Sequence, residues 1–205
     1  MNKVETDHHH SNIQLDLLQE ETFTKTVFGF WLYLMTDCLL FGTLFCTYGV
    51  LHNQTAGGAS SNEIFSLKIA FVETMILLLS SFTCGMALLA SLKFQKGKLI
   101  GWLMTSFILG AAFVFLEVTE FKDLILDGHG PQRSAFLSSY FTLVGTHGLH
   151  VSFGLLWLAV MIWQVITFGI NIETFRRLVL FNMFWHFLDL VWIFLFTFVY
   201  LIGVN

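Results

Sequence analysis

The chain has 205 residues, of which 56% are hydrophobic and 12% charged, and its formal net charge is −4. Water-soluble domains carry about 25% charged residues, so this composition excludes a soluble globule. The 24 Phe and single Pro indicate long, uninterrupted helices in lipid. The polar first 25 residues have no apolar core and no cleavage site, so no cleavable signal peptide is expected.

Five apolar runs each exceed the roughly 20 residues that cross about 30 Å of hydrocarbon. We expect each to be helical, because lipid offers no partner to an unpaired backbone amide. Residues 1–25 are predicted to be a polar, unstructured cytoplasmic arm, and Ser134 is predicted to cap the fourth helix. The predicted fold class is an all-α integral membrane protein whose domain, residues 26–205, has spans at 26–51, 67–92, 99–121, 135–167 and 177–202.

Basic residues divide unequally between the two sides of this predicted bundle. Because Lys and Arg accumulate in cytoplasmic loops, the richer side is expected to be cytoplasmic. The N-terminus is then cytoplasmic and the C-terminus periplasmic. The richer side has Lys3, Lys25, Lys93, Lys96, Lys98, Arg176 and Arg177, and the other has Lys68, Lys122 and Arg133.

Carboxyl groups in the first three spans are candidate site residues, because an ionisable side chain in lipid is costly unless it is paired. The first span contains Asp37, the second Glu73, and the third both Glu117 and Glu120. Helical geometry of about 100° per residue predicts that one narrow stripe of the second span contains Glu73, Ser80, Cys84 and Ser91.

Histidines mark the fourth and fifth spans. His147 and His150 are three positions apart, which places them on one side of a helix, while Gly145 and Gly148 open another face to a neighbouring backbone. In the fifth span a polar stripe within an arc of about 80° is expected to face protein. This stripe consists of Asn182, His186, Asp189, Thr197 and Tyr200.

Depth separates these residues into two layers when each residue advances about 1.5 Å along a helix. One layer lies near the midplane and is predicted to be a structural polar network. The other lies nearer the outer face and holds only carboxyl groups, so burial and like-charge repulsion are expected to leave at least one of them protonated. The midplane layer is Asp37, His147, His150, His186 and Asp189, and the outer layer is Glu73, Glu117 and Glu120.

Three interpretations of the polar residues stay open on spacing alone. Structural hydrogen bonding is favoured, proton or ion transfer is the second, and a metal or haem site is the third. The Glu-x-x-His repeats of helical di-iron sites are missing. No phosphate-binding loop, nucleophile motif or nucleic-acid-binding surface is found in the sequence.

Four ordered segments together carry a family resemblance. They are "GFWLYLMTDCLLFGTLFCTY" (29–48), "FVETMILLLSSFTCGMA" (71–87), "GPQRSAFLSSYFTLVGTHGLHVSFGLLW" (130–157) and "FWHFLDLVWIFLFTFVYL" (184–201). In this order they resemble subunit III of haem–copper oxidases over about residues 26–203. The five-span form and the "NQTAGG" and "GPQRSAFLS" loops most resemble the bacterial ubiquinol oxidase branch of that family.

The resemblance implies a non-catalytic subunit in a bacterial inner membrane. Haems, copper and the quinol site are then expected in subunit I, with no cofactor or metal on this chain. Expected partners are subunit I directly, subunits II and IV, and phospholipids, with no nucleic acid. The role implied is to stabilise subunit I and support proton uptake.

Site roles also follow from the resemblance. Asp37 and Glu73 match the family's buried acids of these two spans. The His147, His150, His186 and Asp189 positions match residues that bond helix to helix. Alternatives are subunit III of a cytochrome c or menaquinol oxidase and, more remotely, a stand-alone haem-binding membrane protein or a proton-coupled carrier.

Overall fold

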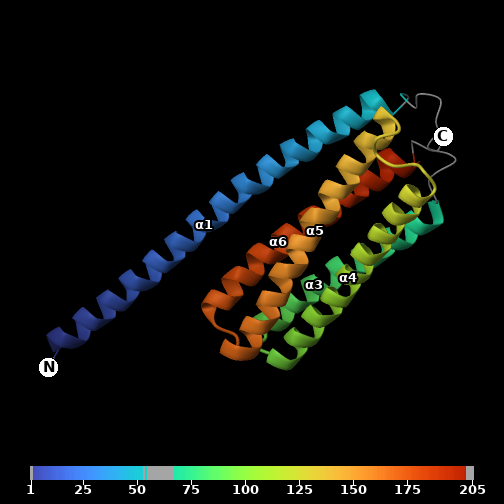
Figure 1. Ribbon diagram of the computed structural model, residues 1–205. Coiled ribbons are helices and arrows are strands. Elements are labelled where there is room, and N and C mark those ends of the chain that lie inside the picture. Colours follow the sequence, from blue (N-terminus) through green and yellow to red (C-terminus); the bar gives the residue numbers. More distant parts are fainter. Residues whose placement is uncertain (1, 53, 55–66, 202–205) are drawn as a thin grey trace. The chain divides into compact units, whose positions relative to one another are not determined.

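The computed structural model describes the backbone of residues 2–52, 54 and 67–201, and side chains from Glu20 onward. Within these ranges all regular elements are helical (Figure 1). The chain divides into two compact units, Met1–Cys38 and Leu39–Asn205. The elements are α1 (Asn2–Leu51), α3 (Leu67–Leu92), α4 (Lys96–Leu126), α5 (Ala135–Phe168), α6 (Ile172–Leu195) and the π-helical segment η1 (Phe196–Leu201).

The prediction of five membrane spans is confirmed, because five helical segments are long and apolar enough to cross a bilayer. Three begin earlier than expected, the first span at Glu20, α4 at Lys96 and α6 at Ile172, and α4 continues to Leu126. The difference arises because hydropathy predicts the part of a helix in lipid, whereas polar residues can prolong the helix beyond it. The "NQTAGG" loop lies outside the described residues.

The expectation of an unstructured N-terminal arm is wrong for the backbone, which is helical from Asn2. Residues 2–28 contain neither Gly nor Pro, the two residues that interrupt helices most strongly. Their polarity indicates contact with water, and a polar segment can still be helical. In the first unit, Lys25 Nζ lies 2.8 Å from Glu21 Oε1, one turn earlier on the same helix.

Four helices of the second unit pack as a bundle. α3 contacts α4 and α6, and α5 contacts the same two helices from the other side, as Figure 1 shows. The part of α1 that belongs to this unit, from Leu39 to Leu51, contributes ring contacts, such as that of Tyr48 with Phe136. The predicted stripe of the second span is confirmed as a buried face of α3: Glu73, Ser80, Cys84 and Ser91.

A serine cap and a glycine turn mark the two ends of α5. The Ser134 hydroxyl accepts a hydrogen bond from the Leu137 amide at 3.1 Å, which confirms the predicted helix cap. At the other end Gly169 has a φ of 74°, a left-handed conformation that glycine adopts without strain. Lys96 Nζ donates to the Ile166 carbonyl oxygen at 2.9 Å and so links the beginning of α4 to the last turns of α5.

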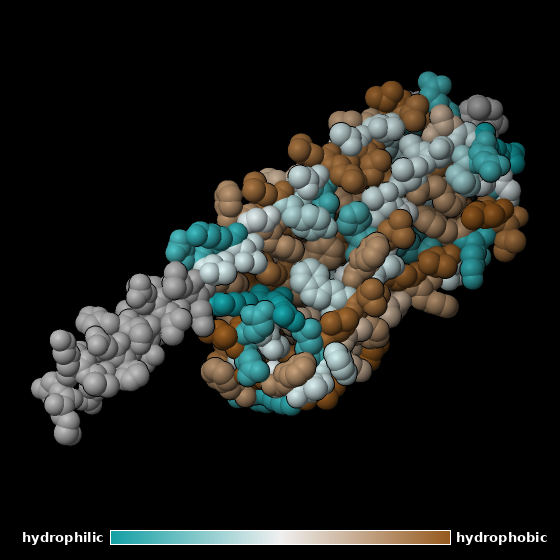
Figure 2. All heavy atoms as spheres, turned by 60° about the vertical axis from the view of Figure 1, so that its left-hand side comes forward, coloured by the Kyte–Doolittle hydropathy of each residue, from teal (hydrophilic) through white to brown (hydrophobic). Residues whose placement is uncertain are grey.

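The outer surface is largely apolar. Large hydrophobic side chains such as Phe115, Phe153 and Trp163 are exposed on the bundle. On the face in Figure 2, hydrophobic side chains cover most of the surface and most hydrophilic ones lie towards its ends. This distribution suits a protein whose middle is in contact with lipid or with other membrane helices.

Candidate functional site

Three carboxyl groups and two tyrosines gather inside the second unit, and we call this group the carboxyl–tyrosine cluster. Glu73 comes from α3, Glu117 and Glu120 come from α4, Tyr140 comes from α5, and Tyr200 comes from η1. The three carboxyl groups are close enough for their charges to interact. The structure therefore brings together all three carboxyl groups predicted for the outer layer.

Glu120 accepts hydrogen bonds from the hydroxyl groups of both tyrosines. Tyr140 Oη lies 3.3 Å and Tyr200 Oη 3.4 Å from Glu120 Oε1, and the two hydroxyl oxygens are 3.0 Å apart. The two hydroxyl groups supply two protons for these three contacts. The arrangement ties α4, α5 and η1 together through one carboxyl oxygen.

Glu73 is the least exposed of the three carboxyl groups. Its side chain is 0% exposed, and neither carboxyl oxygen has a hydrogen-bond partner among the described residues. A buried polar group without a partner costs free energy, which makes Glu73 a candidate for function rather than for stability.

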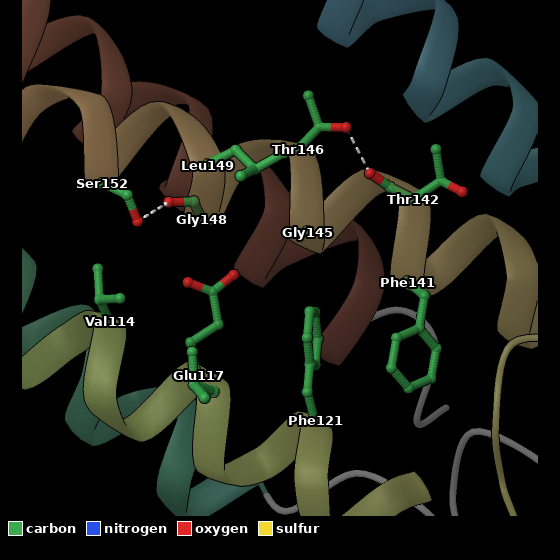
Figure 3. Close-up of a pocket in the computed structure, with 11 residues that line it drawn as sticks. Val114, Glu117, Phe121, Phe141, Thr142, Gly145, Thr146, Gly148, Leu149 and Ser152 are labelled. Atoms are coloured by element: carbon green, nitrogen blue, oxygen red, sulfur yellow. Dashed lines mark hydrogen bonds between the residues drawn. The ribbon is translucent and has the colours of Figure 1, made fainter.

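The Glu117 side chain faces α5 at the position of Gly148. Its side chain is 3% exposed, and Oε1 has no partner in the described part of the chain. Figure 3 shows the carboxyl group extending from α4 towards Gly148. A Cβ at position 148 would lie 2.6 Å from either carboxyl oxygen, so the space left by this glycine admits a side chain. The sequence-based expectation was the approach of a neighbouring backbone.

Tyr200 reaches the cluster from a π-helical segment. The change from α6 to η1 occurs at Phe196, and a π-helical turn contains more residues than an α-helical one. Side chains beyond that point are therefore rotated from the positions that a regular helix would give them. Tyr200 is fully buried there, beside Tyr140.

The surroundings of His147 differ from the polar contact that the sequence predicts. The ring is fully buried, and neither ring nitrogen has a hydrogen-bond partner among the described residues. Aromatic rings surround it, with centroids at 5.2 Å for Trp192, 5.9 Å for Phe113 and 6.2 Å for Phe41. Its observed contacts are thus those of an aromatic core residue.

His150 and His186 each use Nδ1 within their own helix. His150 Nδ1 lies 2.7 Å from the Thr146 carbonyl oxygen, and His186 Nδ1 lies 2.8 Å from that of Asn182. His186, a member of the predicted fifth-span stripe, is exposed on the surface of this chain, and contact of that part of the stripe with protein stays a prediction.

Asp37 and Asp189 complete the predicted midplane layer. Asp189 is buried near Ser81 and His186, whereas Asp37 belongs to the first unit. The structure therefore brings His186 next to Asp189, and the larger network stays a prediction.

Two tryptophans of α6 form hydrogen bonds with α3. These contacts were not predicted from the sequence. Trp185 Nε1 donates to Ser80 Oγ and Trp192 Nε1 to Thr74 Oγ1, each at 3.1 Å. Their spacing of seven residues places both on one face of a helix. The same seven-residue spacing between Tyr140 and His147 could have indicated that Tyr140 lies on a buried face. Among the described residues no group of three or more His, Cys, Asp or Glu could hold a metal ion.

Comparison with known proteins gives one family. The protein-family model described as "Cytochrome c oxidase subunit III" matches residues 19–204. The matched region contains the carboxyl–tyrosine cluster and all helices of the second unit.

Individual relatives come from several bacteria. Cytochrome bo(3) ubiquinol oxidase subunit 3 of Pseudomonas aeruginosa is 57% identical over 179 residues, covering 87% of this chain and 86% of the relative. Quinol oxidase subunit 3 of Bacillus subtilis is 40% identical over 202 residues, or 97% of each chain. Cytochrome c oxidase subunit 3 of Bacillus sp. (strain PS3) is 42% identical over 176 residues, 86% of this chain and 85% of the relative.

Proposed function

Because this chain belongs to the cytochrome c oxidase subunit III family, we propose that it is the non-catalytic subunit III of a bacterial terminal oxidase that oxidises ubiquinol and reduces oxygen to water. Family membership confirms the resemblance drawn from the four sequence segments. Five spanning helices and bacterial oxidase relatives make the chain a multi-pass protein of the bacterial inner membrane. The stand-alone haem protein and the carrier thereby lose their support.

Ubiquinol is the proposed electron donor because the relative named for ubiquinol shares more identical residues with this chain than those named for quinol or cytochrome c. Subunit III of a menaquinol or cytochrome c oxidase is the second candidate. The Bacillus cytochrome c oxidase relative favours it.

The proposed role is support of the catalytic partner. Haems and copper are assigned to subunit I, which this chain would contact directly in a complex with subunits II and IV. The exposed apolar surface of the bundle supports contact with membrane helices and with phospholipid chains. The polar network of Asp37, His147, His150, His186 and Asp189 is proposed to strengthen helix packing within that assembly.

The carboxyl–tyrosine cluster is the feature that supports a role in proton uptake. Glu73 and Glu117 are buried and Glu120 is half-buried, and three carboxyl groups that interact electrically cannot all carry a negative charge without large cost. We therefore propose that at least one of Glu73, Glu117 and Glu120 holds a proton and can exchange it. A lipid-soluble carbodiimide, which reacts with protonated carboxyl groups, should label one of them, and no labelling at any of the three would contradict the proposal.

The proposed orientation has the N-terminus in the cytoplasm and the C-terminus in the periplasm. Lys93, Lys96 and Lys98 lie around the short connection between α3 and α4, and Arg176 and Arg177 lie in the first turns of α6, which supports a cytoplasmic position for both. A phosphatase reporter that is active only in the periplasm should be active at the C-terminus and inactive at the N-terminus; the reverse pattern would invert the orientation.

Purification in mild detergent through a tag on this chain tests the function. We expect the other oxidase subunits to copurify, the complex to show haem in a difference spectrum, and oxygen uptake to be supported by ubiquinol. Uptake supported only by menaquinol or by cytochrome c would establish the second candidate. Isolation of the chain without oxidase subunits would overturn both.

A further inference from the structure

A groove between α4 and α5 adjoins the carboxyl–tyrosine cluster at Glu117 and has no assigned occupant in the function proposed above. Its volume is about 460 Å³, within the range of small-molecule sites. The walls are aliphatic at Val114, Val118 and Leu149 and aromatic at Phe121 and Phe141, whose ring centroids are 4.8 Å apart. Figure 3 shows Val114, Phe121 and Phe141 beside the space between the two helices.

Glu117 supplies the polar group of the groove. Its side chain is nearly fully buried, Oε1 lacks a partner among the described residues, and the carboxyl group points across the groove in Figure 3. The hydroxyl groups of Thr142, Thr146 and Ser152 already donate to carbonyl oxygens of their own helix. The groove therefore offers oxygen acceptors and lacks a free hydroxyl donor among its side chains.

The position of the groove limits what can enter it. Glu117 lies nine residues before the end of α4 at Leu126, or about 14 Å along the helix, so an occupant arrives from within the bilayer. No Lys or Arg is among the lining residues, and a phosphate group would meet a carboxyl group without a cation. An acyl chain fits the apolar walls but has no hydrogen-bond donor for Glu117.

A flat ring that carries hydroxyl groups and an apolar tail meets all these conditions. On the basis of the quinol oxidase function proposed above, we propose that the α4–α5 groove is a second quinol site, apart from the one expected in subunit I, and that a ring hydroxyl donates to the Glu117 carboxyl group. Phe121 and Phe141 provide the aromatic contacts of the ring. The isoprenoid tail leaves past Val118 and Leu149 to the lipid.

Photolabelling of the purified oxidase complex in lipid nanodiscs tests this site. The probe is an azido-ubiquinol with a short isoprenoid tail, kept reduced by excluding oxygen so that its ring hydroxyls can donate, and labelled peptides are identified by mass spectrometry. We expect label on α4 and α5 beside the groove, displaced by excess ubiquinol. Glu117→Leu should weaken labelling about tenfold, the loss expected when one buried hydrogen bond is removed.

Two substitutions on α5 separate filling of the groove from a general effect of added bulk. Leu149→Trp should fill the groove and abolish the label. Leu156→Trp is the matched control, since Leu149 and Leu156 are exposed to 64% and 63% and only Leu149 lines the groove. If Leu149→Trp does not assemble, Val118→Trp fills the groove from α4.

Three results would overturn the site. They are no label on α4 and α5, label that excess ubiquinol does not displace, and label that survives Leu149→Trp. Cross-linking of the groove to another subunit would also overturn it, because a protein would then be the occupant. Oxygen uptake by the same complex is read separately. A complex that oxidises cytochrome c disproves the proposed donor. The photolabelling of α4 and α5 still decides whether the groove is a binding site.

Discussion

Gly148 on α5 occupies the position directly opposite the carboxyl group of Glu117 on α4, and a Cβ there would lie 2.6 Å from both carboxyl oxygens. Real Cβ atoms do not approach other atoms so closely, so Glu117 can keep its place only because residue 148 has no side chain. The glycine thus determines where a buried carboxyl group lies, and through it the shape of the α4–α5 groove.

Gly148→Ala is expected to lower stability by about 1 kcal/mol, the low end of the cost of overpacking, because the clash is with the far end of the flexible Glu117 side chain beside the open groove. The measurement is the temperature at which this chain leaves the purified complex. Gly145→Ala is the control, because a Cβ there would meet Phe121 at 3.6 Å, an ordinary contact. In the double variant with Glu117→Ala the clash disappears, so the two costs should not add; strict additivity would show that the contact is absent.

His147→Phe is expected to change stability by less than about 1.5 kcal/mol, because a ring of similar size is kept among Phe41, Phe113 and Trp192. His147→Ala should cost several kcal/mol through the cavity that it leaves. Heat stability of the complex distinguishes the two variants. If both are equally damaging, the ring nitrogens have an essential polar partner in the assembled oxidase, as the sequence-based network predicts.

Tyr140→Phe is expected to destabilise the bundle by about 1–2 kcal/mol, because the Glu120 and Tyr200 oxygens both lose a hydrogen-bond partner. Tyr48→Phe serves as the control, since the Tyr48 hydroxyl is buried and has no partner among the described residues. Chemical denaturation of the purified protein compares the two. Equal stability of both variants would mean that the tyrosine contacts of Glu120 contribute nothing.

Trp192→Phe is expected to cost about 1–3 kcal/mol, because the hydrogen bond to Thr74 is lost and buried volume is removed from the α3–α6 contact. Trp163→Phe, at a residue exposed on the bundle surface, should have little effect. The fraction of chain that remains in the complex after heating measures both. A comparable loss from Trp163→Phe would indicate that the lipid-facing surface, rather than the helix contact, carries the stability.

Part of the candidate site could be predicted from the sequence, because helical periodicity is local. Glu73, Ser80, Cys84 and Ser91 were assigned to one stripe of the second span, and α3 buries that stripe. In the fifth-span stripe, His186 is exposed on the surface of this chain, so its predicted contact with protein stays a prediction. A polar stripe must avoid lipid, but periodicity does not say whether a neighbouring helix of the same chain or another partner covers it.

The amino-acid sequence by itself determined that this protein has five helices long and apolar enough to cross a membrane and which carboxyl groups lie within them. The reason is that lipid cannot satisfy a backbone amide, so every long apolar run must be helical. Only the tertiary structure decided that Tyr140 and Tyr200 converge on Glu120 and that Glu117 faces Gly148. Those pairings depend on how each helix is rotated against its neighbour and on the π-helical segment before Tyr200, and neither is encoded in the spacing along one helix.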